Sequence, residues 1–261
     1  MKLGIIGAMP EEIERIAEDF QRDASQFVAG REYHIGRFKG CDAVLVFSRW
    51  GKVAAAATAT ALIERFNVDC IIFTGVAGAV ATHLDVGDVV IADRLIQHDF
   101  DVSAARISDD AGGMLPKYAI PFLGISYFPV EERLVVLARK AAEEYISSSA
   151  AGMSDHPMSD HPWKFGATRS VHVGTIASGD QFIAHREKLE TLRVEIPNVL
   201  CVEMEGAAVA QVCHEYKVPY LVIRAISDKA DHSAPMDFLS FVRDVARHYS
   251  YGILNTLVSR L

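Results

Sequence analysis

The chain has 261 residues, of which 50% are hydrophobic, and its formal net charge at pH 7 is −8. This length supports one sizeable hydrophobic core, so a single domain spanning 1–261 is expected. The acidic balance, with no cluster of basic residues, argues against a nucleic-acid partner.

The cysteines and the N-terminal segment bear on the cellular compartment. The four cysteines lie in apolar segments without Cys-x-x-Cys spacing, and we expect buried thiols in a reducing environment. The segment MKLGIIGAMPEE turns acidic early and lacks the long apolar core of a signal peptide. No later run is long enough to span a membrane, so the sequence predicts a soluble cytoplasmic protein without a membrane partner.

Short apolar runs rich in β-branched residues alternate with segments of helical periodicity. In chain order these are strand 3–7, helix 10–20, a more mixed strand 33–38, strand 43–48, helix 52–66, strand 70–76, strand 89–92, helix 130–146, strand 171–177, strand 199–203, helix 205–216, strand 220–226 and helix 237–258. Several strands are continuously apolar, which suits strands covered on both faces. The alternation predicts an α/β three-layer sandwich, with a mostly parallel or mixed central sheet flanked by helices.

One stretch differs in composition from the rest: SSSAAGMSDHPMSDHPWKFG, residues 147–166. Its tandem MSDHP repeat is interpreted as an exposed, flexible insertion between a helix and a strand. His156 and His161 also raise the possibility of a metal site, but no further ligand pair with zinc spacing lies nearby. The sequence therefore predicts no metal site.

Two glycine-containing segments, GIIGAMPEE and GVAGA, follow predicted strands. Neither has the G-x-G-x-x-G spacing of a dinucleotide loop, and no P-loop lysine follows. Gly75 and Gly78 either turn the chain or let the backbone approach a ligand at the carboxyl end of a strand. The residues alone leave both readings open.

Carboxylates follow three of the predicted strands. Glu12 comes after the first, Glu205 after strand 199–203, and Asp228 after strand 220–226. Each has a plain structural explanation as a helix-dipole or capping residue. The carboxyl ends of parallel strands converge, however, and three carboxylates at one rim suit acid–base chemistry better than structure.

The segment ASGDQFI, residues 177–183, places Phe182 and Ile183 after a Gly-Asp turn. An aromatic residue at this position is either part of the core or a stacking face for a flat heterocycle.

Taken in order, the segments GIIGAMPEE, TGVAGA, SGDQFI, VEMEGAAVAQVC and RAISDKAD resemble the 5′-methylthioadenosine/S-adenosylhomocysteine nucleosidases of the nucleoside phosphorylase superfamily. The resemblance covers nearly the whole chain, apart from the MSDHP insertion and a variable stretch around 104–128. It implies a nucleoside phosphorylase-like fold and cleavage by water of the N-glycosidic bond of 5′-methylthioadenosine and S-adenosylhomocysteine. The products would be adenine and the 5-thioribose compound, and no metal or organic cofactor would be needed.

The resemblance also implies roles for the polar residues. Glu12 would position and deprotonate the water, and Asp228, with Ser227 beside it, would deliver a proton to adenine N7. Glu205 would bind the ribose hydroxyls, with Arg224 as its partner, whereas Glu203 has a weaker claim.

The same resemblance places the substrate among apolar groups. Phe182 would stack on adenine, and the backbone of Ile183 would read its Watson–Crick edge. The substrate-binding residues further expected are Met9, Met204 and Phe238, which would line the ribose and alkylthio pocket, together with Val76 and Gly78. A homodimer is expected from the family alone.

Two departures from the family pattern leave alternatives open. Val76 stands where many relatives carry a hydroxyl residue, and Arg49 and Trp50 stand where relatives often have smaller ones. Arg49 could bind phosphate, as in a phosphate-dependent purine nucleoside phosphorylase. Against this, Val76 cannot donate a hydrogen bond to phosphate, and Glu12 would repel the anion.

Two further alternatives concern the substrate and the chemistry. The unfamiliar stretch 112–128 leaves the 5′ group open, and an aminodeoxyfutalosine nucleosidase would share the same mechanism. A catalytically silent nucleoside-binding module would keep Phe182 and Glu205 but could lose Glu12 and Asp228. The presence of all four favours an enzyme.

Overall fold

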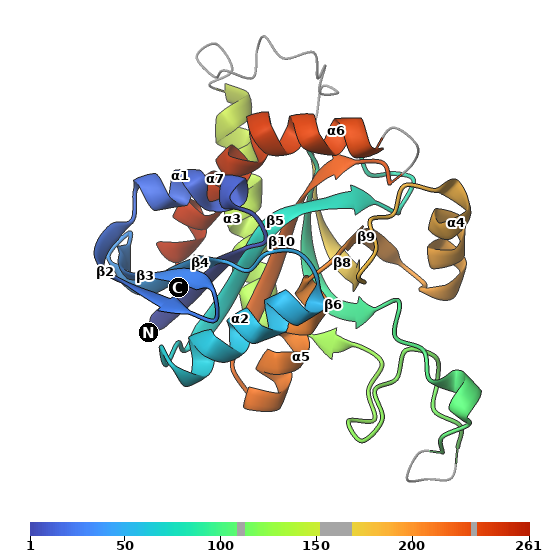
Figure 1. The fold of residues 1–261 in the computed structure, drawn as a ribbon. Coiled ribbons are helices and arrows are strands. Elements are labelled where there is room, and N and C mark those ends of the chain that lie inside the picture. Colours follow the sequence, from blue (N-terminus) through green and yellow to red (C-terminus); the bar gives the residue numbers. More distant parts are fainter. Residues whose placement is uncertain (109–112, 152–168, 231–233) are drawn as a thin grey trace.

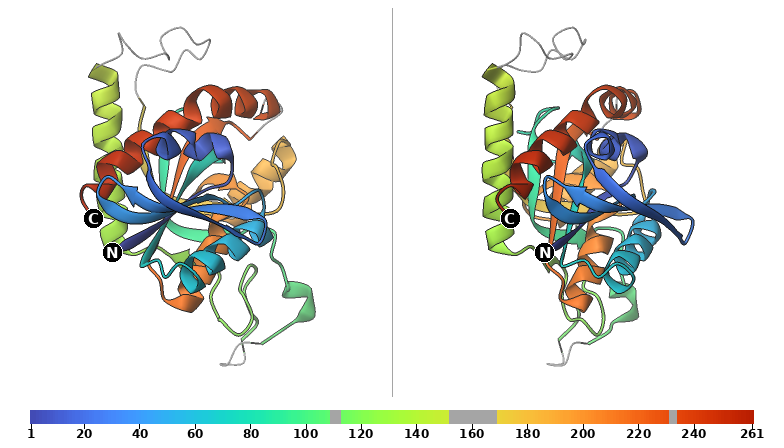
Figure 2. Two further views of the ribbon diagram at one scale, coloured as in Figure 1. Left: turned by 60° about the vertical axis from the view of Figure 1, so that its left-hand side comes forward. Right: turned by 90° about the vertical axis from the view of Figure 1, so that its left-hand side faces the viewer.

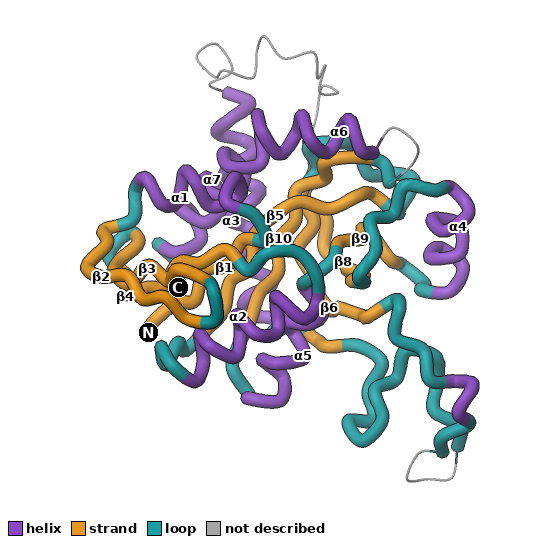
Figure 3. The backbone as a smooth tube through the Cα atoms, viewed as in Figure 1, coloured by secondary structure: helices purple, strands orange, loops and turns teal. Residues whose placement is uncertain are grey.

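The computed structural model describes residues 1–108, 113–151, 169–230 and 234–261. A central sheet is covered by helices on both faces, with α2 and α5 below it and α1, α6 and α7 above it in the view of Figure 1. The helices within each layer pack on one another, α2 on α5, and both α1 and α3 on α7. The predicted three-layer α/β sandwich is therefore confirmed, and Figure 3 shows its helices and strands by colour.

The sheet contains parallel and antiparallel pairs. Its strands are β1 (Lys2–Gly7), β2 (Gln21–Val28), β3 (Arg31–Phe38), β4 (Cys41–Phe47), β5 (Cys70–Ala79), β6 (Val89–Gln97), β7 (Phe128–Pro129), β8 (Val171–Ser178), β9 (Val199–Glu203) and β10 (Tyr220–Asp228). Every residue of β5 and β10 is buried, in agreement with the continuous apolar runs of these segments.

The helices are α1 (Pro10–Glu18), α2 (Lys52–Glu64), α3 (Glu132–Ala151), α4 (Arg186–Glu195), α5 (Gly206–Tyr216), α6 (Ala234–Phe241) and α7 (Arg247–Val258), with a short 3₁₀ turn at Ser103–Ala105. A π-helical turn, Val242–Ala246, joins α6 to α7, so the single predicted helix 237–258 is three consecutive helical segments. Pro10 occupies the first turn of α1, as expected from its fixed φ.

The strand pairing closes half of the sheet on itself. β5 pairs with β10, β10 with β6, β6 with β8, β8 with β9, and β9 returns to β5. The last contact is short and antiparallel, between Gly78 and Val202 and between Ala79 and Cys201. β1 continues from β5 on the open side, followed by β4, β3 and β2. The two additional views in Figure 2 show how the open part fans out from this closed part.

Among the described residues, two strands and one α-helix were not predicted. β2 is an exposed edge strand of mostly polar residues, so it lacks the apolar signal of a core strand. β7 has only two residues. α4 has few apolar residues, although its buried Leu189 and Leu192 are spaced as on one face of a helix.

The predicted insertion at 147–166 begins inside helix α3, which continues to Ala151. The remainder, 152–166, lies outside the described residues, and so do His156 and His161. Between β6 and β7, residues 98–108 and 113–127 reach away from the sheet (Figure 1). Among the described residues, no helix combines the length and the apolar character needed to cross a bilayer.

Candidate active site

A cavity of about 420 Å³ opens where β1, β5, β9 and β10 end. Its lining combines carboxylates with apolar and aromatic side chains, as is common for small-molecule sites. The lining residues are Ala8, Met9, Glu12, Trp50, Val76, Ala77, Gly78, Gln181, Phe182, Ile183, Val202, Glu203, Met204, Glu205, Ser227, Asp228, Phe238 and Leu239. The predicted convergence of strand ends is therefore present in the fold.

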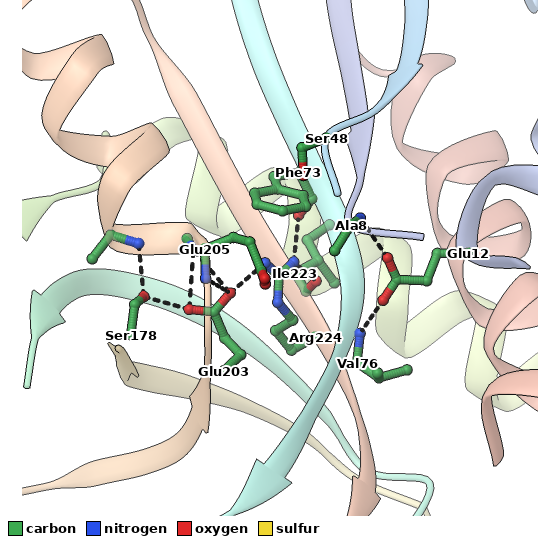
Figure 4. Close-up of polar contacts among 12 residues, drawn as sticks. Ala8, Glu12, Ser48, Phe73, Val76, Ser178, Glu203, Glu205, Ile223 and Arg224 are labelled. Carbon is green, nitrogen blue, oxygen red and sulfur yellow. Dashed lines mark hydrogen bonds and ion pairs between the residues drawn. The ribbon is translucent and has the colours of Figure 1, made fainter. Parts of the chain in front are cut away.

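Glu12 sits in the first turn of α1 and is 2% exposed. Its Oε2 accepts hydrogen bonds from the amides of Ala8 (2.6 Å) and Met9 (3.1 Å), and its Oε1 accepts one from Val76 (3.0 Å). Figure 4 shows the contacts with Ala8 and Val76. Burial raises the pKa of Glu12, although Arg224 and the three amides act in the opposite direction. A carboxylate with a raised pKa is suited to accept a proton near neutral pH.

Two glycines make room for the carboxyl groups of Glu12 and Asp228. A Cβ at Gly75 would lie 2.5 Å from Oε1 of Glu12, and a Cβ at Gly78 would lie 2.9 Å from Oδ1 of Asp228. Close approach of the backbone to these two side chains therefore explains the Gly-x-x-Gly spacing of β5, a packing role that differs from both readings of the sequence.

Asp228 ends β10 and is 2% exposed. Its Oδ2 accepts a hydrogen bond from the Ser227 hydroxyl (2.8 Å), and its Oδ1 accepts one from the Ala230 amide (2.8 Å). These contacts fix the carboxyl group at the cavity wall.

The resemblance implied that Arg224 pairs with Glu205, but the structure shows another partner. The Nη2 atom of Arg224 donates a hydrogen bond to Oε2 of Glu203 (2.6 Å). Glu203 also accepts hydrogen bonds from the Ser178 hydroxyl and from the amides of Glu205 and Gly206. Figure 4 shows Glu203 between Ser178 and Arg224, apart from the Glu12 cluster. Glu203 thus holds the end of β9 and the start of α5, a role that the sequence reading gave little weight.

Glu205 directly precedes α5 and is 5% exposed. Its Oε1 accepts a hydrogen bond from the Gly51 amide (2.7 Å), at the N-cap of α2. Burial, followed by repulsion from Glu203, raises the pKa of Glu205 to about 8. The raised pKa favours the protonated form of the carboxyl group.

Aromatic side chains form the other wall of the cavity. Phe182 and Phe238 meet edge to face with ring centroids 5.4 Å apart, and Trp50 meets Phe238 in the same way at 6.3 Å. Phe182 remains 45% exposed and Trp50 59% exposed, so both rings offer free faces at the cavity.

Most of the predicted site residues line this one cavity. They are Met9, Glu12, Val76, Gly78, Phe182, Ile183, Met204, Glu205, Ser227, Asp228 and Phe238. Arg224 is the exception, because it lies behind Glu203 and contacts the Phe73 ring at 4.1 Å. Gln181 and Leu239 were not predicted, although each neighbours a predicted residue in the chain.

Arg49 does not line the cavity. Its Nη2 donates to the Gly30 carbonyl (2.5 Å) in the β2–β3 turn, which directs the guanidinium away from the carboxylates. The phosphate-binding role considered for Arg49 therefore has no support in its position. Its neighbour Trp50 does reach the cavity.

Comparison with known proteins identifies the family of this chain. The profile of the Phosphorylase superfamily matches residues 2–259. The 5′-methylthioadenosine/S-adenosylhomocysteine nucleosidase of Haemophilus influenzae (strain PittGG) is 37% identical over 262 residues, covering 100% of both chains. That of Aeromonas salmonicida (strain A449) is 35% identical over 257 residues, covering 98% of this chain and 99% of the relative.

Solved structures agree. The Helicobacter pylori 5′-methylthioadenosine/S-adenosylhomocysteine nucleosidase superposes with a TM-score of 0.83 at 34% identity, covering 100% of this chain and 99% of the other. The Streptococcus pneumoniae enzyme, solved with the transition-state inhibitor MT-ImmA, superposes with a TM-score of 0.79 at 36% identity, covering 99% of this chain and 98% of the other. The futalosine hydrolase of Helicobacter pylori strain 26695 superposes with a TM-score of 0.82 at 34% identity, covering 100% of this chain and 98% of the other.

The mixed sheet flanked by helices is thus that of the phosphorylase superfamily. Within it, the chain belongs to the 5′-methylthioadenosine/S-adenosylhomocysteine nucleosidase family of purine N-glycosyl hydrolases, and the resemblance found in the sequence is confirmed.

Proposed function

We propose that this protein hydrolyses the N-glycosidic bond of 5′-methylthioadenosine and S-adenosylhomocysteine and releases adenine and the 5-thioribose product. The observation that carries the proposal is the convergence of Glu12, Glu205 and Asp228 on one cavity with an aromatic wall. Breaking a ribosidic bond builds positive charge on the sugar and negative charge on the leaving base. An ionised carboxylate stabilises the positive charge on the sugar, and a protonated carboxyl group neutralises the leaving base by giving it a proton.

Asp228 is the general acid in this proposal. It delivers its proton to adenine N7 as the glycosidic electrons move to the base, so adenine leaves as a neutral molecule. The hydrogen bonds from Ser227 and Ala230 hold the carboxyl group in one orientation.

Glu12 is the general base. A carboxylate offers about four lone-pair sites, and three amides occupy Glu12 in this structure. One site remains for a water proton, so the amides both fix the carboxylate and limit it to a single water. That water adds to the anomeric carbon, and Glu12 takes up its proton.

Glu205 accepts hydrogen bonds from the ribose diol. A protonated carboxyl group is a poorer acceptor than a carboxylate, so binding of the diol favours loss of the Glu205 proton. The Gly51 amide on Oε1 supports the ionised form.

The apolar residues hold the rest of the nucleoside. Phe182 stacks on adenine, and the Ile183 backbone reads the Watson–Crick edge. Met9, Met204 and Phe238 enclose the ribose and the alkylthio group. Val76 and Gly78 contribute backbone surface at the end of β5.

Water is favoured over phosphate as the nucleophile. The described residues that line the cavity include four carboxyl groups, of Glu12, Glu203, Glu205 and Asp228, and no lysine, arginine or histidine. A phosphate anion would meet repulsion there without a compensating cation.

A futalosine-type nucleoside is the second candidate substrate, because a futalosine hydrolase superposes as well as the methylthioadenosine enzymes do. The mechanism would be unchanged, and only the 5′ group would differ.

The decisive experiment measures adenine release in phosphate-free buffer with 5′-methylthioadenosine, S-adenosylhomocysteine and aminodeoxyfutalosine in parallel. We expect release without phosphate and the highest kcat/KM on the first two nucleosides. Strict dependence on phosphate would overturn the hydrolytic reading, and a preference for aminodeoxyfutalosine would select the second candidate.

We further propose a cytoplasmic homodimer, on the basis of the family and of exposed apolar side chains such as Phe122 and Val53. Sedimentation at micromolar concentration tests the dimer, and cell fractionation tests the compartment.

A further inference from the structure

Three residues beside the cavity form a closed ring of hydrogen bonds. The Lys52 amide donates to Oδ1 of Asp180 (2.7 Å), and the Asp180 amide donates to Oδ2 of Asp99 (2.8 Å). The Lys52 ammonium closes the ring by donating a hydrogen bond to Oδ1 of Asp99 (2.5 Å). We call Lys52, Asp99 and Asp180 the clasp. None of the three is a cavity-lining residue.

The clasp joins three segments that are distant in the sequence. Lys52 is the first residue of α2, Asp99 follows β6, and Asp180 lies in the loop between β8 and α4. Two of these segments carry cavity residues directly beside the clasp. Asp180 is followed by Gln181, Phe182 and Ile183, and Trp50 lies two residues before Lys52.

Gly51 connects the clasp to the ribose-binding carboxyl group. The Gly51 and Lys52 amides are adjacent at the start of α2; the first donates to Glu205 and the second to Asp180. A Cβ at Gly51 would lie 3.0 Å from Oδ1 of Asp180, and its φ of +92° is left-handed. Displacement of Asp180 would therefore move the donor that Glu205 uses.

We propose that Lys52, Asp99 and Asp180 are positioning residues for nucleoside cleavage, which hold the adenine-binding loop and the Gly51 donor to Glu205 in a single fixed arrangement. The inference rests on the proposed function, because it assigns the clasp to the same site.

The ion pair in the clasp is more enclosed than a surface pair. The side chains of Lys52 and Asp99 are 17% and 16% exposed, and Gln97 accepts a second hydrogen bond from the Lys52 ammonium (3.2 Å). Exposed pairs are screened by solvent and fix little geometry, whereas partly buried, multiply bonded pairs hold their partners in place. Misplacement by about 1 Å can cost about 10²-fold in rate.

The test compares Lys52→Met with Lys39→Met. Lys39 also pairs with an aspartate, Asp19, but neither residue lines the cavity. We expect Lys52→Met to lower kcat/KM by about 10- to 100-fold, through both a higher KM and a lower kcat. Lys39→Met should stay within about twofold of the parent. Lys52→Arg, which keeps the charge, should recover most of the loss.

The isosteric variant Asp99→Asn serves if Lys52→Met does not fold. The double variant Lys52→Met with Asp99→Asn should be no worse than the poorer single variant, because members of one unit are not additive. Equal rates in the Lys52→Met and Lys39→Met enzymes, or additive losses in the double variant, would overturn the proposal.

Amide hydrogen exchange provides a readout that does not depend on turnover. We expect faster exchange in peptides covering 50–53 and 178–184 in Lys52→Met, with no change there in Lys39→Met. Unchanged exchange in both would refute the clasp itself. If the parent protein releases no adenine from any nucleoside while these peptides behave as expected, the proposed function fails and the clasp stands.

Discussion

Arg224 and Glu203 form an ion pair of 2.6 Å in which the two side chains are 1% and 3% exposed. The guanidinium also donates to the carbonyls of Phe73 and Ile223, and the carboxylate accepts from Ser178 and from the backbone at the start of α5. The pair therefore ties β10 to β9 directly beneath the cavity. Glu203 lines the cavity, whereas Arg224 does not.

Removal of one member of this pair should leave a buried charge without its partner. We expect Glu203→Ala to lower the free energy of unfolding by about 3–5 kcal/mol, as measured by urea denaturation. The exposed pair between Arg247 and Glu14, 2.9 Å apart, provides the control. Glu14→Ala should cost less than about 1 kcal/mol, and equal costs for the two variants would contradict the structural role of Glu203.

Asp228→Asn and Glu12→Gln should each keep the fold and lose catalysis. Both changes preserve shape, but each removes the group that gives or takes a proton. We expect kcat to fall by about 10²–10⁴-fold in each variant, while binding of adenine, followed by calorimetry, is retained better than turnover. A variant with the parent rate would remove its residue from the mechanism.

Stability should decrease as the pH rises through the titration range of Glu205. Its pKa is raised from an ordinary value of 4.5 to about 8 in the folded protein. Between these values the folded state holds a proton that the unfolded state has released. The corresponding stabilisation is therefore complete below pH 4.5 and is lost as the pH rises through about 8.

Glu205→Gln isolates this contribution. Urea unfolding of the parent and of the variant should be measured across pH 4.5–8.5. The unfolding free energy of the parent minus that of the variant should decrease as the pH rises. Parallel pH dependences for the two proteins would show that Glu205 does not titrate in this window.

Trp50 should contribute to recognition of an apolar 5′ substituent. Its indole lines the cavity mouth beside Phe238. We expect Trp50→Ala to raise KM for 5′-methylthioadenosine by about 2- to 10-fold and to change KM for adenosine less. Phe27→Ala, at an exposed aromatic residue that does not line the cavity, is the control. Identical changes on both nucleosides would remove Trp50 from 5′ recognition.

The position of Glu12 and Asp228 at one rim could be predicted from chain direction, because each lies at or directly after the carboxyl end of a strand in the parallel set β1, β5 and β10. β9 pairs antiparallel with β5, so the position of Glu205 beside them depends on how the strands close and not on a shared direction. The partner of Arg224 could not be predicted, because it depends on how β9 and β10 sit within the closed set of strands. β9 joins β5 over only two residue pairs, which no periodicity in the sequence indicates.

The missed elements have a similar explanation. β2 contributes no core face, so selection for apolar residues is absent along it. The clasp was also invisible in the sequence, since Lys52, Asp99 and Asp180 belong to three segments whose proximity arises only in the tertiary structure.

The short pairing of Gly78 with Val202 has a consequence for biosynthesis. It joins a region made early in translation to one made much later, and the proposed catalytic groups lie on both sides of this contact. Nascent chains that have not yet received β9 and β10 lack Asp228 and Glu205 and have no enclosed cavity. Enzymatic turnover is consequently a late reporter of folding: it should begin only after the last strands dock, well after helical content has risen.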